Sequence, residues 1–205
     1  AIPVAPYLED PYIESMLAGG IEANKRDVPV VLDPVAVGAS RLRNETSNRL
    51  LQEIRPTVIR GNASEILALA GQGVGKGVDS MHAADQALEA AKNLAEEYRC
   101  AVVISGEKDI VTDGVQSLAI ANGHPMMPRV TGLGCTSSAV CGAFCAVSET
   151  PLGAAAAAMA VMGVAGEIAA EQAKGPGTLQ LYLYDALYLL SDEIMKQRLN
   201  LEEIA

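Results

Sequence analysis

The stretch Arg129-Val130-Thr131-Gly132-Leu133-Gly134-Cys135-Thr136-Ser137-Ser138 leads directly into an apolar segment that is rich in alanine and glycine. Its two glycines carry no Cβ, so the backbone there can turn tightly and approach a ligand closely. The apolar periodicity that follows predicts a helix, and a glycine-rich turn at a helix start presents free backbone N–H groups beside the positive end of the helix dipole. The stretch therefore predicts either an anion site, suited to phosphate or to phosphoryl transfer, or a loop that only starts a packed helix.

The whole chain has the size and composition of one α/β domain spanning residues 1–205. Half of the residues are hydrophobic, but there is one Phe and no Trp, so we expect a core of Ala, Val, Leu, Ile and Met. The formal charge of −10 argues against a nucleic-acid partner, because binding to a phosphate backbone needs clustered Lys and Arg. A small phosphorylated ligand needs only a local site, which this charge does not exclude.

The cysteines and the most apolar segment both fit a cytoplasmic protein. The four cysteines form no CxxC pair and have no histidine cluster beside them, so we expect no zinc site. Cys141 and Cys145 lie one helical turn apart, as core residues of a reduced protein would. Residues 152–170 are mostly Ala and Gly and include Glu167, which favours a buried helix over a membrane span. We therefore expect a soluble, cytoplasmic protein with no membrane partner.

Strand-like and helix-like segments alternate along the chain. After a short or irregular entry at 1–8, the expected strands are 28–32, 57–59, 101–104, 109–112 and 116–121. The expected helices are 11–25 (capped by Asp10), 44–54, 81–98 (capped by Asp79 or Ser80), 136–148, 151–172 and 179–199 (capped by Thr178). Alternation, then a β-hairpin near the middle, then three helices predicts an α/β fold with a mostly parallel central sheet flanked by helices.

Three polar residues mark the edge of this sheet where ligands are expected. Asp33, Asn62 and Ser105 each come at or shortly after the carboxyl end of an expected strand. Open α/β sheets bind ligands at that edge, so these side chains are candidates for a common site. Asp33 also precedes Pro34, so a turn-forming role is an alternative to a ligand-facing one.

The segment Arg60-Gly61-Asn62-Ala63-Ser64-Glu65 offers two roles for each of its main polar residues. Asn62 and Glu65 have the spacing of a capping box, which would only start a helix. They could also face the ligand edge, where Glu65 could help to hold a hydrated Mg²⁺. Arg60 could meet a phosphate or form a surface ion pair.

The glycine-rich segment 71–77 does not have the sequence of a phosphate-binding P-loop. Lys76 is followed by Gly77 where the Walker pattern needs Ser or Thr, and the segment follows an expected helix rather than a strand. A connection between two helices is the better interpretation.

Six stretches, taken in their order along nearly the whole chain, resemble the hydroxyethylthiazole kinase family of the ribokinase-like superfamily. They are VPVVLDPVAVGAS (28–40), IRGNASEI (59–66), GKGVDS (75–80), VVISGEKDIVTDG (102–114), NGHPMMPRVTGLGC (122–135) and GPGTLQLYLYDALYLL (175–190). The resemblance implies a ribokinase-like fold and ATP-dependent phosphorylation of the hydroxyethyl group of 5-(2-hydroxyethyl)-4-methylthiazole in thiamine biosynthesis and salvage. It also implies Mg²⁺ as a cofactor and a homotrimer with sites near the subunit interfaces.

The same resemblance implies roles for the residues at the strand ends. Arg60 and Ser105 match ATP-binding residues of the family. Asp33 and Glu65 match acidic residues that are associated with the metal, and Asn62 supports Glu65 in an N-x-x-E signature.

In such a kinase the stretch 129–138 would hold the transfer centre. Gly132 matches a substrate-binding glycine, and Cys135 stands where most ribokinase relatives carry the aspartate base, a replacement typical of this family. The N–H groups of Gly132, Leu133, Gly134 and Cys135 would form the anion hole. Cys135 would accept the proton of the alcohol, a task that a loose transition state makes undemanding.

The chain also departs from the family. It is N-terminally short, without the segment that contributes substrate-pocket residues, and it has Val4-Ala5-Pro6-Tyr7 where the family has an Asn-Ile-Gly-Thr-like strand end. It reads Gly-Leu-Gly-Cys where Gly-Thr-Gly-Cys is common. The alternatives are therefore another ribokinase-like small-molecule kinase, a nucleotide-repair dehydratase, or a non-catalytic binding protein with this fold.

Overall fold

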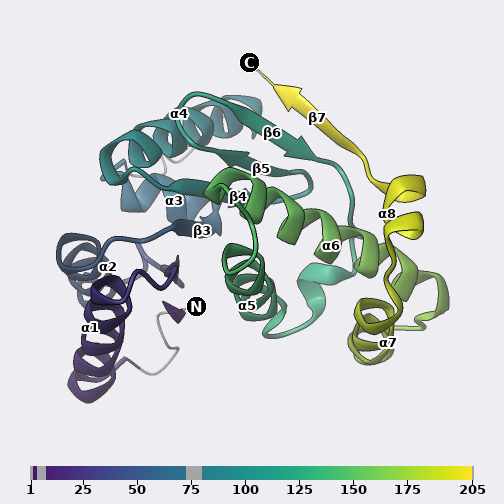
Figure 1. Cartoon of the computed structure of the whole chain (residues 1–205), viewed down its shortest axis with the longest axis horizontal. Coiled ribbons are helices and arrows are strands. Elements are labelled where there is room, and N and C mark those ends of the chain that lie inside the picture. Colours follow the sequence, from purple (N-terminus) through teal and green to yellow (C-terminus); the bar gives the residue numbers. More distant parts are fainter. Residues whose placement is uncertain (1, 4–7, 73–79, 205) are drawn as a thin grey trace.

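In the computed structural model (Figure 1), the chain forms one sheet with helices on both faces. The structure describes residues 2–3, 8–72 and 80–204. The strands are β1 (Ile2–Pro3), β2 (Val31–Asp33), β3 (Val58–Asn62), β4 (Ala101–Ser105), β5 (Asp109–Thr112), β6 (Ser117–Ile120) and β7 (Leu201–Ile204). The helices are α1 (Asp10–Lys25), α2 (Arg41–Glu53), α3 (Ala63–Leu69), α4 (Ser80–Tyr98), α5 (Leu133–Cys145), α6 (Pro151–Gln172), α7 (Pro176–Leu189) and α8 (Asp192–Arg198), with a 3₁₀ turn η1 (Met127–Arg129) before α5.

The strands lie side by side in the order in which they occur along the chain. The strands β1 to β4 are parallel, and β5, β6 and β7 each run antiparallel to the strand before them. The connections between parallel strands are right-handed as a rule, and three such steps in one direction place their helices on one face. Helices α1 to α4 accordingly share one core with the sheet, and the opposite face is left to α5 and α6.

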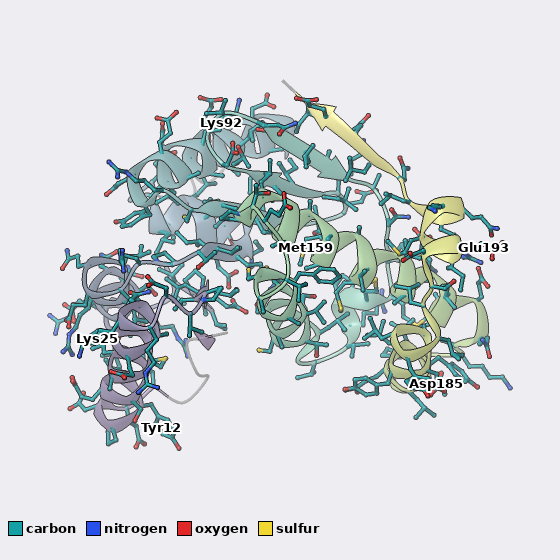
Figure 2. All side chains as sticks on the ribbon, viewed as in Figure 1. Tyr12, Lys25, Lys92, Met159, Asp185 and Glu193 are labelled. Carbon is teal, nitrogen blue, oxygen red and sulfur yellow. The ribbon has the colours of Figure 1, made fainter. Side chains whose placement is uncertain are left out.

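Successive residues of the parallel strands point to opposite faces and build the two cores. Leu32, Ile59 and Val102 pack with α1 to α4, whereas their strand neighbours Val31 and Val58 pack with α5 and α6. The buried Met159 of α6 lies at the centre of the molecule in Figure 2, where that helix meets the sheet. Strands that are apolar on both sides in this way are typical of a sheet covered on both faces.

Helix α6 is a core helix. By length and composition it could cross a membrane, but 72% of its most apolar window is buried inside the protein. Its acidic residue Glu167 accepts hydrogen bonds at 3.0 Å from the side chain of Asn122 and from the backbone of Gly123. The buried-helix interpretation of this segment is therefore confirmed.

The α/β class, the parallel strands and the hairpin of β5 and β6 agree with the sequence-based expectation. Three features of the C-terminal part do not: the helix expected at 179–199, its expected cap, and the strand β7, which the sequence did not predict. The expected helix 179–199 is two helices, because Leu190 leaves the helical conformation at ψ 134° and Ser191 caps α8. Gly175, not Thr178, is the N-cap of α7: Thr178 lies within the first turn, where its hydroxyl accepts from the N–H groups of Lys174 and Gly175.

Several boundaries also differ. Helix α5 begins at Leu133 rather than 136, α1 has Glu9 rather than Asp10 as its N-cap, and α2 begins at Arg41 because Ser40 caps it. The cap expected at Asp79 and the connection around Lys76 lie outside the described residues.

The glycines of the helices provide a test of how closely α6 approaches its neighbours. A Cβ added at Gly163 would lie 2.7 Å from Asn122 Cβ and 2.8 Å from Asn122 O, whereas one added at Gly19 of α1 would meet nothing within 4 Å. We expect Gly163→Ala to lower the free energy of unfolding by about 1–3 kcal/mol through overpacking. Gly19→Ala should raise it by roughly 0.5–1 kcal/mol, because alanine favours the helix. Urea denaturation of both variants measures this, and a Gly163→Ala variant as stable as the parent would contradict the packing described.

Candidate functional site

The candidate site lies at the carboxyl edge of the parallel strands. Asp33 ends β2, Asn62 ends β3 and Ser105 ends β4, and Asn62 is paired with Ser105 in the sheet register. The structure thus brings these three residues to one edge, as the sequence predicted. Arg60 lies two residues before the end of β3, so its side chain projects from the strand itself.

Asp33 is a buried carboxylate with two partners. Only 3% of the residue is exposed, its Oδ2 accepts a hydrogen bond from Ser138 Oγ at 2.7 Å, and Arg60 Nη1 lies 3.7 Å from the same oxygen. Burial raises the pKa of Asp33, while the Ser138 hydroxyl and the Arg60 charge oppose that rise and the Glu65 charge adds to it. The side chain of Arg60 is 13% exposed, so the surface ion-pair alternative for this residue is wrong.

Asn62 and Glu65 form the expected capping box at the start of α3. Asn62 Oδ1 accepts from the Glu65 N–H at 3.0 Å, and Glu65 Oε2 accepts from the Asn62 N–H at 2.8 Å. Glu65 Oε1 accepts a further bond, at 2.8 Å, from the N–H of Ala36 in the loop after β2. The Glu65 carboxylate therefore joins the loop after β2 to the junction of β3 and α3, in addition to capping the helix.

The start of α5 presents free N–H groups beside these residues. Gly132 has φ +83° and precedes the helix, and the first helical bond runs from the Thr136 N–H to the Gly132 carbonyl. The Leu133 N–H points to the Val130 carbonyl at 3.4 Å, but those of Gly134 and Cys135 have no partner among the described residues. The Cys135 thiol is exposed. A helix start with free donors is suited to an anion.

The Arg60 guanidinium lies against this helix start. A Cβ added at Gly134 would be only 3.1 Å from Arg60 Nη1, so the absence of a side chain at Gly134 permits the contact. Arg60 Nε and Ser105 Oγ are both buried and have no hydrogen-bond partner in the described part of the chain. Buried polar atoms are seldom left unpaired, and these two therefore indicate a ligand at this edge.

The described residues contain no group of three or more His, Cys, Asp or Glu that could enclose a metal ion. Mg²⁺ does not require one, because it is commonly held by one or two carboxylates together with water and substrate phosphates. Asp33 Oδ1 accepts no hydrogen bond from the described residues, and each Glu65 oxygen accepts one backbone N–H. The donor set therefore fits a magnesium ion that the phosphates of a nucleotide also coordinate.

A pocket of about 770 Å³ adjoins the capping box. Its lining consists of Ala36, Val37, Gly38, Ala39, Asn44, Asn62, Ser64, Glu65, Ala68, Gly71 and Gln72. Glu65 is the one ionisable residue among these, so the pocket joins the site through the same carboxylate that links the loop after β2 to the start of α3.

Two polar residues of this region were not singled out from the sequence. Ser138 appeared only as one of the small polar residues at the start of a helix, and nothing local tied it to Asp33, 105 residues earlier. Asp109, at the start of β5, accepts from the Gly106 N–H at 3.1 Å and so holds the turn after Ser105. A carboxylate close after a strand end was the available signal for Asp109.

Comparison with known proteins gives a consistent set of relatives. The sequence profile described as the hydroxyethylthiazole kinase family matches residues 6–193. A hydroxyethylthiazole kinase of Oleidesulfovibrio alaskensis is 54% identical over 182 residues, which are 88% of this chain and 68% of that protein.

Solved structures are similar over most of the chain. A hydroxyethylthiazole kinase protein from Pyrococcus horikoshii has a TM-score of 0.87 at 35% identity, and the match covers 97% of this chain and 74% of that one. A pyridoxal kinase from Staphylococcus aureus has a TM-score of 0.62 at 18% identity, covering 93% of this chain and 68% of that one. The second likeness concerns the fold alone, which is that of the ribokinase-like kinases.

Asp109 predicts a pH dependence of stability. Burial raises the pKa of its carboxyl from 3.8 to about 6, while the Gly106 N–H and the Arg60 charge oppose the rise. An acid whose pKa rises on folding binds more protons in the folded state, so its contribution to stability is full below about pH 4 and declines as the pH rises through about 6. The neutral, isosteric Asp109→Asn variant should therefore gain stability over the parent at pH 7.5, by on the order of 1–2 kcal/mol.

This gain should vanish near pH 4, where the parent carboxyl is itself protonated. Urea denaturation of both proteins at pH 4 and pH 7.5 measures the difference. An equal difference at the two pH values would show that the substitution acts on packing rather than on charge.

Proposed function

The chain belongs to the hydroxyethylthiazole kinase family, and from this we propose that it phosphorylates the hydroxyethyl group of 5-(2-hydroxyethyl)-4-methylthiazole in thiamine biosynthesis. As a kinase it takes ATP as co-substrate. The observation that carries the proposal is a pair of buried donors, Arg60 Nε and Ser105 Oγ, that have no partner among the described residues and lie at the same edge as the start of α5 with its free N–H groups. Charged and neutral donors that converge in a partly buried site favour a polyphosphate.

Arg60 and Ser105 are assigned to the nucleotide. The guanidinium bears its charge permanently and has an unused Nε–H, which suits it to a phosphate oxygen. The Ser105 hydroxyl, at the end of the neighbouring strand β4, is free to donate to the same nucleotide. Both groups would then gain the partners that the described part of the chain does not provide.

The start of α5 is assigned to the phosphoryl group in transfer. The free N–H groups of Gly134 and Cys135 would stabilise its equatorial oxygens, and the exposed backbone at Gly132 would allow the acceptor alcohol a close approach. Leu133 completes the turn, its own N–H being directed to Val130. In-line attack by the alcohol then requires little covalent help from the protein.

Asp33 and Glu65 are assigned to Mg²⁺, with Asn62 holding Glu65 in position. When bound, the ion would neutralise negative charge on the phosphates. Asp33 would contribute through its uncommitted Oδ1, and Glu65 through a water molecule, since both of its oxygens already accept backbone N–H groups.

We further propose the domain organisation, cellular location and oligomeric state of the enzyme. Residues 1–205 would act as one kinase domain in a cytoplasmic homotrimer with its sites near the subunit interfaces, as the family resemblance implies. Analytical ultracentrifugation of the purified chain measures the oligomeric state.

Release of ADP, measured in a coupled assay with ATP, Mg²⁺ and the thiazole alcohol, tests the function. Hydroxymethylpyrimidine and pyridoxal serve as control acceptors. We expect the thiazole alcohol to have the highest kcat/KM. Preference for another acceptor would assign a different ribokinase-like activity, and calorimetry that detects no ATP·Mg²⁺ binding would favour a non-catalytic protein.

Cys135 is proposed to accept the hydroxyl proton at Sγ. Cys135→Ala should lower kcat by about 10- to 100-fold without abolishing nucleotide binding. This loss is at or below the low end of general-base effects, because a loose transition state asks little of the base. Cys135→Asp should retain or raise the activity. Cys145→Ala, which removes a half-buried thiol farther along the same helix, is the matched control. Parental turnover in Cys135→Ala would refute the assignment as base.

A further inference from the structure

The hydroxyl of Ser138 links the start of α5 to the sheet. Ser138 is completely buried, and its Oγ lies 2.7 Å from Asp33 Oδ2 and 3.2 Å from the carbonyl oxygen of Gly134. A serine hydroxyl has one proton to donate. The shorter contact, to a carboxylate, is the stronger, so the proton is directed at Asp33 across to β2.

A second contact holds the helix one turn closer to its start. Gly134 lies so close to the Arg60 guanidinium that an added Cβ would come within 3.1 Å of Nη1. Arg60 Nη1 is in turn 3.7 Å from Asp33 Oδ2, the oxygen that Ser138 contacts. The start of α5 is thus positioned against β2 through Ser138 in its second turn and against β3 through Gly134 in its first, and both contacts involve the neighbourhood of Asp33 Oδ2.

The neighbouring Ser137 is also buried, but its hydroxyl forms no hydrogen bond to another element. It is 7% exposed, and its hydroxyl donates to the Leu133 carbonyl of its own helix at 3.1 Å. Among the described residues, Ser138 is the one α5 side chain that hydrogen-bonds to another element of the fold.

We propose that Ser138 is a positioning residue for phosphoryl transfer. Its bond to Asp33 fixes the position of the start of α5 relative to Arg60. That position determines where the free N–H groups of Gly134 and Cys135 and the Cys135 thiol lie. This inference rests on the proposed function of the site. Ser138 touches neither substrate: it acts through the helix, whose N–H groups must meet the phosphoryl oxygens within hydrogen-bond distance.

The inference predicts a selective effect on the transition state. In the proposed site a ground-state nucleotide would be bound mainly by the strand residues Arg60 and Ser105, with neither of which Ser138 forms a hydrogen bond. The transferring phosphoryl group depends on the helix start, where a displacement of about 1 Å can reduce the rate by about 100-fold. Ser138→Ala should therefore lower kcat by about 10-fold or more, with the KM for ATP changed by less than about twofold.

Equilibrium binding gives a second readout that needs no acceptor alcohol. ADP with Mg²⁺ represents the ground state, and ADP with Mg²⁺ and aluminium fluoride mimics the phosphoryl group in transfer. Ser138→Ala should weaken binding of the aluminium fluoride complex by about tenfold and leave ADP binding within about twofold. Ser138→Thr keeps the hydroxyl and should restore most of the kcat. Ser137→Ala is the matched control and should resemble the parent in both measurements.

Thermal unfolding of each variant is recorded alongside. If Ser138→Ala does not fold, Ser138→Cys, similar in size to the parent but a weak donor, takes its place and should show the same selective loss. Parental kcat and parental aluminium fluoride affinity in the Ala or Cys variant would overturn the inference, as would an equal loss in Ser137→Ala. If the parent itself neither binds ADP nor releases it from ATP, the proposed function fails instead.

Discussion

The burial of the Asp33 carboxylate is the constraint around which the site is arranged. A charge removed from water is costly unless it is hydrogen-bonded and paired, and Asp33 Oδ2 obtains both partners at this edge of the sheet. Ser138 comes from α5 and Arg60 from β3, so the carboxylate connects the two halves of the chain. The same arrangement brings the donors of α5 to the ends of the parallel strands.

This meeting depends on how the chain is wound. Because the connections between β1 and β4 keep α1 to α4 on one face, the other face is open to the two apolar helices α5 and α6. The small residues of α6 then allow a close approach. Gly163 lies against Asn122 and Gly166 against the flexible side chain of Met127, while Asn122 also accepts from the Asn200 N–H beside the last strand. Helix α6 thereby fixes the segment that leads into α5.

Features that depend on local sequence were predicted well. The apolar runs became β2, β3 and β4, and the Asn62–Glu65 spacing became a capping box, because burial pattern and capping involve neighbours along the chain. The last strand was missed, because the residues of β7 are mostly exposed and show no apolar alternation. β7 is defined by its backbone pairing with β6, whose residues lie some 80 positions earlier in the chain. A pattern of neighbouring residues cannot show such a pairing.

The sequence by itself determined the α/β class, the edge of the sheet that carries the polar residues, and the glycine turn at Gly132, since each follows from residue type and spacing. Only the tertiary structure decided that Ser138 bonds to Asp33, that Gly134 accommodates Arg60, and that Arg60 Nε and Ser105 Oγ find no hydrogen-bond partner among the residues the structure describes. Those facts depend on distances between elements that are remote in the chain. Helix packing sets these distances, and they cannot be read from the sequence.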